Sequence, residues 1–304
     1  MQPLPLFAVA ALALMPACAS CYNTCAEPTE AELAPLPSRL SETGLFGDAG
    51  VIVYAPAFEL WADGAEKHRA LLLPPGAQID TRNPDDWQFP EGTRVWKTFV
   101  RDGVRVETRL LLKTGDSWAA AAYRWDGDDA VLFPEGGRDV NGTPHDVPAA
   151  ATCTACHGGR ASFVLGFSAL QLANVAPGGF TLDEAVSRGL LSQPPASTAA
   201  LRIPGDAKQR AALGYLHANC AHCHNADRPE REGPRCFAPR PGLDLLLRAG
   251  ELGDAQQTAT YRTLVPRGAS AAHSRMEARQ MPPLATEEVD TAGVALIRAW
   301  AESP

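Results

Sequence analysis

Alternation of apolar and polar residues marks the chain between about residues 51 and 133 as β structure. Two strand-like runs, 95–100 and 104–112, flank Arg101-Asp102-Gly103, and an Asp-Gly pair in this position signals a hairpin. Further runs at 117–125 and 130–133 follow tight polar turns. The pattern predicts an antiparallel meander with one packed face and one wetter face.

The stretch 104–110 shows the alternation most clearly. Its apolar positions are Val104, Val106 and Leu110, and its charged positions are Arg105, Glu107 and Arg109. This is the pattern of a half-buried strand.

Helical signals follow the β region. Thr181 to Glu184 reads as a capping box that opens a helix to about residue 191. Residues 207–219 predict a helix, and 243–248 predict the start of a short one. Thr286 is the expected cap of a final helix whose apolar stripe ends at Trp300. The expected fold class is therefore α+β, with an N-terminal antiparallel β domain before mainly α-helical segments.

Five tryptophans lie in the β region, where we expect packing roles, with a ligand platform as the alternative. They are Trp61, Trp87, Trp96, Trp118 and Trp125. Three polar residues that are close in sequence are expected to form a solvated turn rather than a metal site. They are Asp63, Glu66 and His68.

Two copies of Cys-x-x-Cys-His follow the β region, and this sequence is the attachment motif of a c-type haem. The two thiols add to the haem vinyl groups, and the histidine becomes the proximal iron ligand. We therefore expect two covalently bound haem c groups. The binding residues are the cysteines Cys153, Cys156, Cys220 and Cys223 and the iron ligands His157 and His224. The alternatives are a zinc site, a disulfide or a redox dithiol.

The ligand on the other side of each iron separates the candidate functions. Met281 precedes two prolines in a stiff loop, so we expect its thioether to be the distal ligand of the second haem, with a gap-filling role as the alternative. No methionine lies between His157 and the second motif. The first haem has several candidate distal ligands, or none. The candidates are His145, His217, His222, His273 and Met276.

The leader and the haem motifs predict export from the cytoplasm, and the charge bears on the choice of partner. The 304-residue chain has a net charge of −8, which argues against nucleic acid and fits a redox partner with a basic surface. Residues 1–20 predict a signal peptide or a lipoprotein leader, and the only expected membrane contact is such a lipid anchor. Four further cysteines have no predictable pairing. They are Cys18, Cys21, Cys25 and Cys236.

The C-terminal hundred residues resemble class I cytochrome c. Leu216 and Ala212 stand where that family usually has an aromatic residue and a glycine, and Met281-Pro282-Pro283-Leu284 matches its methionine loop. The wider chain, from about 54 to 300, resembles an uncharacterised group of bacterial dihaem proteins. Its matching segments include Leu60 to Lys67, Val95 to Phe99 and Phe163 to Phe167. The resemblance implies architecture and haem content, and no substrate.

The expected organisation is a leader (1–20), a tether (21–45), a β domain (46–140), a first haem-binding segment (141–204) and a class I cytochrome c-like domain (205–304). We expect a periplasmic electron carrier rather than a catalyst. The alternatives are a dihaem peroxidase or oxidase with one open haem, and a haem-containing ligand-binding or sensing module.

Overall fold

The structure is a computed structural model that describes residues 29–175, 178–228 and 242–304. The expected leader and the cysteines Cys18, Cys21, Cys25 and Cys236 lie outside these ranges. Within them, no helix combines the length and the apolar character that crossing a membrane would require.

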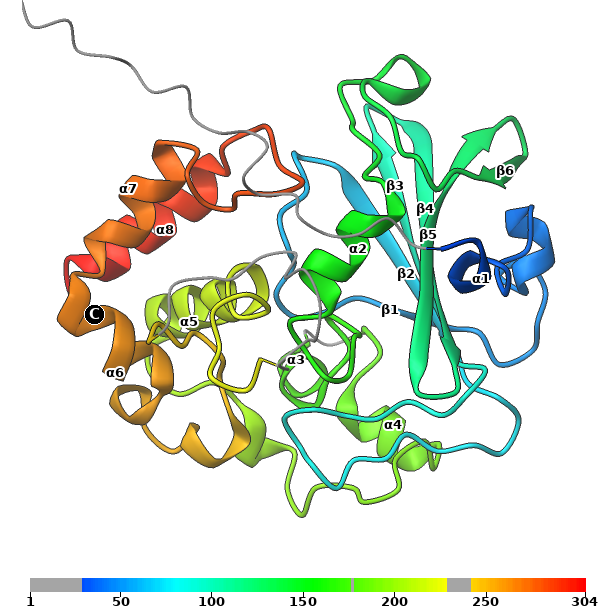
Figure 1. The fold of residues 1–304 in the computed structure, drawn as a ribbon. Coiled ribbons are helices and arrows are strands. Elements are labelled where there is room, and N and C mark those ends of the chain that lie inside the picture. The colour runs from blue at the N-terminus through cyan, green and yellow to red at the C-terminus, as the bar shows by residue number, and fades with distance from the viewer. Residues whose placement is uncertain (1–28, 176–177, 229–241) are drawn as a thin grey trace, which may run out of the picture.

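Six strands form one antiparallel sheet in which each strand pairs with the next along the chain (Figure 1). They are β1 (Ile52–Tyr54), β2 (Glu66–Leu72), β3 (Arg94–Arg101), β4 (Val104–Thr114), β5 (Ser117–Asp126) and β6 (Asp129–Leu132). The predicted meander and the α+β class are confirmed. In the β3–β4 hairpin, Asp102 and Gly103 both have positive φ, at 51° and 79°, which is the turn geometry that an Asp-Gly pair favours.

One expectation near β2 is wrong. Glu66 and His68 lie within this strand, on its exposed side, where their side chains form an ion pair of 3.1 Å. Asp63 accepts hydrogen bonds from the backbone N–H groups of Glu287 and Glu288 instead. The three residues therefore do not form one solvated turn, because Glu66 and His68 are paired with β3 in the sheet.

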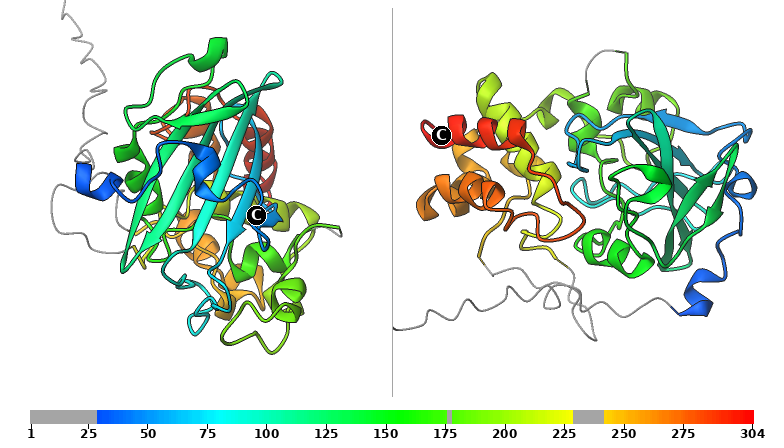
Figure 2. Two further views of the ribbon diagram at one scale, coloured as in Figure 1. Left: turned by 90° about the vertical axis from the view of Figure 1, so that its right-hand side faces the viewer. Right: turned by 90° about the horizontal axis from the view of Figure 1, so that it is seen from above.

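Both faces of the sheet are covered, which corrects two further expectations. Residues from Thr29 on, expected as a tether, form α1 (Glu30–Leu33) and η2 (Leu40–Thr43). Leu36 and Leu40 are buried in one hydrophobic cluster with Trp96 of the sheet. Figure 2 (left) shows this N-terminal segment crossing in front of the strands, with the C-terminal helices behind them. The sheet therefore has no wetter face of the kind predicted.

The helices lie on the side of the other face, some packed on the sheet and others on one another. They are α2 (Ala150–His157), α3 (Ala169–Ala173), α4 (Leu182–Ser187), α5 (Ala207–Asn219), α6 (Ala259–Leu264), α7 (Ser270–Glu277) and α8 (Thr291–Ala301). Short 3₁₀ turns join them: η3 (Val140–Gly142), η4 (Ala199–Leu201), η5 (Ala249–Glu251), η6 (Ala255–Gln257) and η7 (Val265–Arg267).

The helix predictions had mixed outcomes. The helix predicted at 207–219 is α5, and Thr181 caps α4, which ends four residues earlier than expected. Thr286 does not cap the last helix. Asp290 does, by accepting a hydrogen bond of 2.8 Å from the N–H of Gly293. Residues 243–248 are not helical, because Leu245 and Leu247 donate their N–H groups to His224 and His217.

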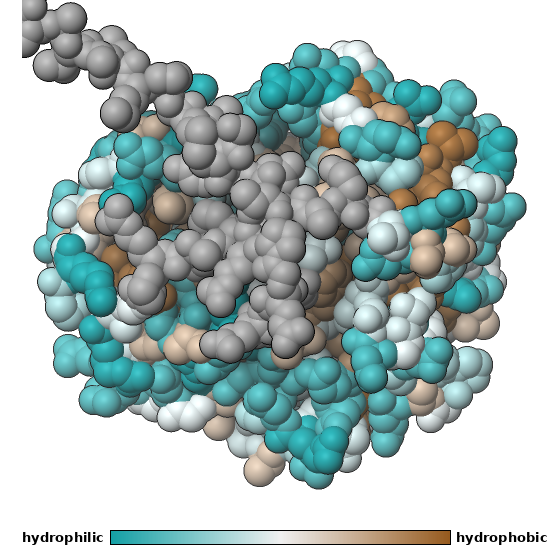
Figure 3. All heavy atoms as spheres, in the orientation of Figure 1, coloured by the Kyte–Doolittle hydropathy of each residue, from teal (hydrophilic) through white to brown (hydrophobic). Residues whose placement is uncertain are grey.

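One hydrophobic core joins the sheet to the helices. It contains Tyr54 and Leu71 of the sheet together with Phe167, Leu213 of α5 and Trp300 of α8. On the face in Figure 3, hydrophilic residues cover most of the described surface. The β region and the segments carrying the two Cys-x-x-Cys-His motifs therefore share one interior.

Candidate cofactor site

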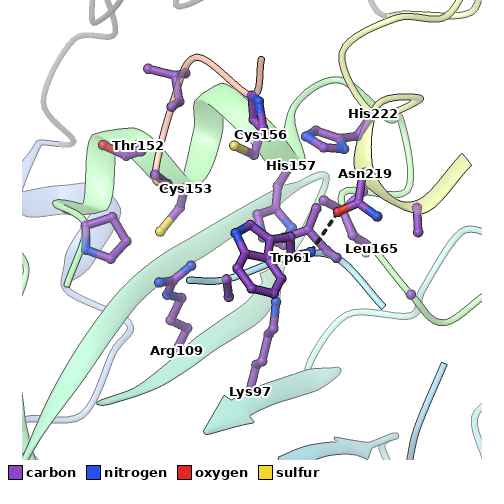
Figure 4. A pocket seen from close by; sticks show the side chains of 18 of the residues that line it. Trp61, Lys97, Arg109, Thr152, Cys153, Cys156, His157, Leu165, Asn219 and His222 are labelled. Carbon is purple, nitrogen blue, oxygen red and sulfur yellow. Dashed lines mark hydrogen bonds between the residues drawn. The ribbon is translucent and has the colours of Figure 1, made fainter. Parts of the chain in front are cut away.

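A cavity of about 630 Å³ lies between α2, the sheet and the end of α5. Cys153, Cys156 and His157 of α2 face it, and Lys97 and Arg109 approach from the strands below (Figure 4). Cofactor sites typically measure about 300–1,000 Å³ and combine apolar walls with a few polar groups. The cavity is therefore large enough for a cofactor beside the first motif.

Helix α2 presents the first motif to this cavity. Residues three and four apart lie on one side of a helix, so Cys153, Cys156 and His157 project together. Both sulfurs are free thiols, and burial raises the pKa of Cys153 to about 11. Two neutral thiols and an imidazole thus open onto one space (Figure 4).

The imidazole of His157 is oriented by the loop that follows α2. Its Nδ1 lies 2.7 Å from the carbonyl oxygen of Phe163 and donates a hydrogen bond to it. Phe163 has a φ of 62°, an uncommon backbone conformation for a non-glycine residue. Burial lowers the pKa of His157 to about 4, so the ring is neutral at pH 7. Its proton is on Nδ1, and Nε2 keeps the lone pair that a metal would bind.

Three cations stand side by side on the sheet face below α2. Arg69 of β2 pairs in register with Lys97 of β3, and Lys97 pairs with Arg109 of β4. We call these three residues the cation row. Like charges directly opposite one another destabilise a sheet, so such a row requires compensation.

Only the outer members of the cation row have carboxylate partners among the described residues. Arg69 pairs with Glu59 at 3.1 Å, and Arg109 pairs with Glu107 at 2.6 Å. The Glu107 side chain is 0% exposed, which corrects the expectation of a wetter charged face on this strand. For the Lys97 ammonium, the structure shows a cation–π contact with the ring of Phe99, whose centroid is 4.9 Å from Nζ.

The structure engages two of the candidate distal ligands elsewhere. Nε2 of His145 lies 2.8 Å from the Glu107 carboxylate. Nδ1 of His217 accepts a hydrogen bond of 3.2 Å from the N–H of Leu247, so the proton of this neutral ring is on Nε2. Burial lowers the pKa of His217 to about 3. Both residues line the cavity, but neither presents a free Nε2 lone pair.

Of the other candidates, His222 lines the cavity and its ring points toward Cys156 (Figure 4). Its Nδ1 is buried and has no hydrogen-bond partner among the described residues. Its backbone carbonyl abuts Gly159, where an added Cβ would lie 1.7 Å from that oxygen. His273 and Met276 belong to α7 and do not line the cavity.

The second motif begins where α5 ends, and it touches the turn that follows the first motif. Cys220 is the C-terminal cap of α5, and Asn225 donates a hydrogen bond of 3.3 Å to the carbonyl of Gly159. After burial, the charge of Cys156 is the next cause that raises the pKa of Cys223. Burial raises the pKa values of Cys220 and Cys223 to about 12. The fold therefore brings the two motifs together from positions 67 residues apart in the sequence.

The loop of Met281 lies beside the second motif. The Met281 N–H donates to the carbonyl of Arg275 at 3.2 Å. The pKa of His224 is lowered first by burial, then by the charge of Arg228, and then by the charge of Arg275. Pro282 and Leu284 of the same loop line the cavity. The Met281 side chain is half-buried, and the structure shows no contact between it and His224.

The described residues contain no group of three or more His, Cys, Asp and Glu side chains suited to a metal ion. The four motif cysteines are unpaired. Comparison with known proteins adds no identity, because no protein family, curated protein or solved structure matches the chain.

The residues present fit a c-type haem at the first motif. The cavity supplies the room, the thiols face it, and His157 already has the tautomer that leaves Nε2 for iron. Sequence reasoning missed Arg69 and Lys97, although the alternating charges of their strands mark one face. Knowledge of the register across β2, β3 and β4 would have identified them, because that register places Arg69, Lys97 and Arg109 side by side.

Proposed function

We propose that this chain is an extracytoplasmic dihaem c-type cytochrome that moves single electrons between redox partners. The observation that carries the proposal is the orientation of His157. Its Nδ1 is hydrogen bonded to the Phe163 carbonyl at 2.7 Å, beside two free thiols that face a cavity. Haem-ligating histidines in general make this type of second hydrogen bond, which fixes the ring and leaves Nε2 for the metal.

The chain's own residues would hold the cofactors in distinct ways. Cys153 and Cys156 would anchor the first haem as thioethers, and His157 would bind its iron. When bound, a haem supplies a one-electron couple whose potential depends on its axial ligands and on burial. The apolar residues Val164 and Phe167, which line the cavity, would exclude water from that site.

Contact between the second motif and the turn after the first motif supports transfer within the molecule. The Gly159 backbone packs against His222, and Asn225 binds the Gly159 carbonyl. Two haems attached to these segments would therefore be neighbours. The net charge of −8 favours partners with a basic docking surface.

A peroxidase is the second candidate, and one observation favours it. His145 and Arg109 both line the cavity, and both contact the buried carboxylate of Glu107. A carboxylate that orients an imidazole is a common arrangement for a general acid or base. This function requires one iron with an open coordination position.

A reduced optical spectrum with and without carbon monoxide, combined with a potentiometric titration, tests the proposal. We expect two one-electron transitions and no carbon monoxide shift, because an electron carrier has two six-coordinate irons. Carbon monoxide binding by one haem, together with turnover of peroxide, would replace this proposal by the peroxidase.

A further inference from the structure

We propose that Lys97 is the sixth ligand of the iron at the first haem site. The inference rests on the proposed dihaem function and deepens it, since it concerns which residue fills the remaining coordination position of the first iron. It also gives the β region a role, because the ligand comes from the middle of the sheet.

Placement is the first argument. Lys97 lies in β3, and it lines the cavity together with Cys153, Cys156 and His157. Its side chain rises from the sheet toward α2, whereas the motif side chains descend from α2 toward the sheet (Figure 4). A cofactor attached to α2 in this cavity would therefore have Lys97 on the wall formed by the sheet.

The state of the other candidates is the second argument. Each of two other cavity histidines has one ring nitrogen engaged: Nε2 of His145 by Glu107, and Nδ1 of His217 by the Leu247 N–H. The backbone of His222 packs against Gly159, which follows the proximal ligand His157 by two residues. His222 therefore lies on the same side of the cavity as His157. Lys97 is the cation of the row that no described carboxylate pairs.

The charge environment is the third argument, because an ammonium group has no lone pair and only the neutral amine can bind iron. Burial first, and then Arg69, Arg109 and Lys67, lower the pKa of Lys97 well below its ordinary range. Glu107 acts in the opposite direction. Cys156 and His157 of α2 and His222 of the second motif line the same cavity as Lys97.

Binding requires one proton to leave Nζ for solvent, after which the nitrogen lone pair forms the bond to iron with no change in oxidation state. Phe99 provides a weak competing interaction for the ammonium form, but Arg109 lies over the same ring at 4.2 Å. The cations on both sides therefore favour release of the proton.

The test compares Lys97→Arg and Lys97→Leu with the wild-type protein, all matured with haem. Arginine keeps the positive charge but cannot act as an amine ligand. We expect no carbon monoxide binding in the wild type and binding by one of the two haems in both variants. Lys113→Leu is the matched control, because Lys113 lies on the same face of the sheet as Lys97 but outside the cavity, and it should behave as the wild type.

An alternative role for Lys97 is that of a cation that binds a haem carboxylate. In that case Lys97→Arg would match the wild type while Lys97→Leu would differ, and the ligand proposal would be overturned. Six-coordinate spectra in both variants would overturn it as well. Intact mass separates these results from failure of the dihaem function, because every variant must first carry two haems.

A spectrum of the wild type keeps the proposal testable even if the variants do not fold. The near-infrared magnetic circular dichroism of the oxidised protein differs between amine, imidazole and thioether ligation. We expect one haem with amine and imidazole ligands. A spectrum containing only imidazole and thioether ligation would contradict the proposal.

Discussion

The two Cys-x-x-Cys-His motifs have the same five-residue pattern but different surroundings. The first lies on α2 above a sheet that carries three cations, and its histidine is oriented by the Phe163 carbonyl. The second caps α5, which packs beside α8, and Nδ1 of His224 has no partner among the described residues. The motif determines what can be attached. The surrounding elements would determine what closes the other side of a bound iron, so two sites with the same motif would differ in their properties.

The largest expected effect is the loss of one haem at a time. In the double variant Cys153→Ala/Cys156→Ala the first haem has no thioether anchor, so the mass should correspond to one bound haem. The double variant Cys220→Ala/Cys223→Ala should also keep one haem, bound at the first site. Intact mass spectrometry measures both. Retention of two haems by either variant would show that its motif is not an attachment site.

The next effect concerns the sheet wall of the first site. Glu107 is fully buried and contacts both Arg109 and His145, so Glu107→Gln leaves the Arg109 charge without its partner. Removing one member of a buried ion pair typically costs about 3–5 kcal/mol. Urea unfolding should show this loss, whereas Glu66→Gln, at an exposed ion pair, should cost less than about 1 kcal/mol. Equal losses would mean that the wall is not held together by Glu107.

His217 should make the free energy of unfolding depend on pH in the acid range, unlike an exposed histidine. Burial lowers its pKa from 6.5 to about 3, so its contribution to stability is complete above pH 6.5 and is lost as the pH falls toward 3. Linkage gives a loss of about 3 kcal/mol between pH 7 and pH 4 for this group. In His217→Gln, the unfolding free energy should fall less steeply over that range. His68→Gln, at an exposed position, is the control, and an unchanged slope in His217→Gln would contradict the assignment.

The smallest effect separates the two irons. A thioether ligand raises the potential of a haem, so Met281→Ala should lower one potential and leave the other in place. Potentiometric titration followed in the visible spectrum measures both. Two unchanged potentials would mean that Met281 does not bind the second iron, and two changed potentials would mean that the sites are not separable in this way.

The sequence allowed the sheet and the motifs to be predicted, for local reasons. Asp102-Gly103 specifies its hairpin through positive φ, and α5 follows from a periodic apolar face that leads into Cys220. These signals lie within a few residues of what they determine, so no tertiary information is needed.

The wall of the first site could not be predicted because it depends on contacts between distant segments. The charged residues Glu107 and Arg109 alternate with apolar ones, which is the usual pattern of a solvated face. Here that face is covered by α2, more than forty residues later in the chain. The same limit applies to Leu36 and Leu40, which follow a polar stretch and yet pack on the sheet.

The central claim is that the chain carries two covalent haems, and intact mass of the full chain tests it most directly. The protein should be exported in a host that matures c-type cytochromes, alongside a known cytochrome as a positive control. The account predicts a mass equal to the processed polypeptide plus two haem groups. The bare polypeptide mass, in cells where the control cytochrome is fully matured, would contradict it.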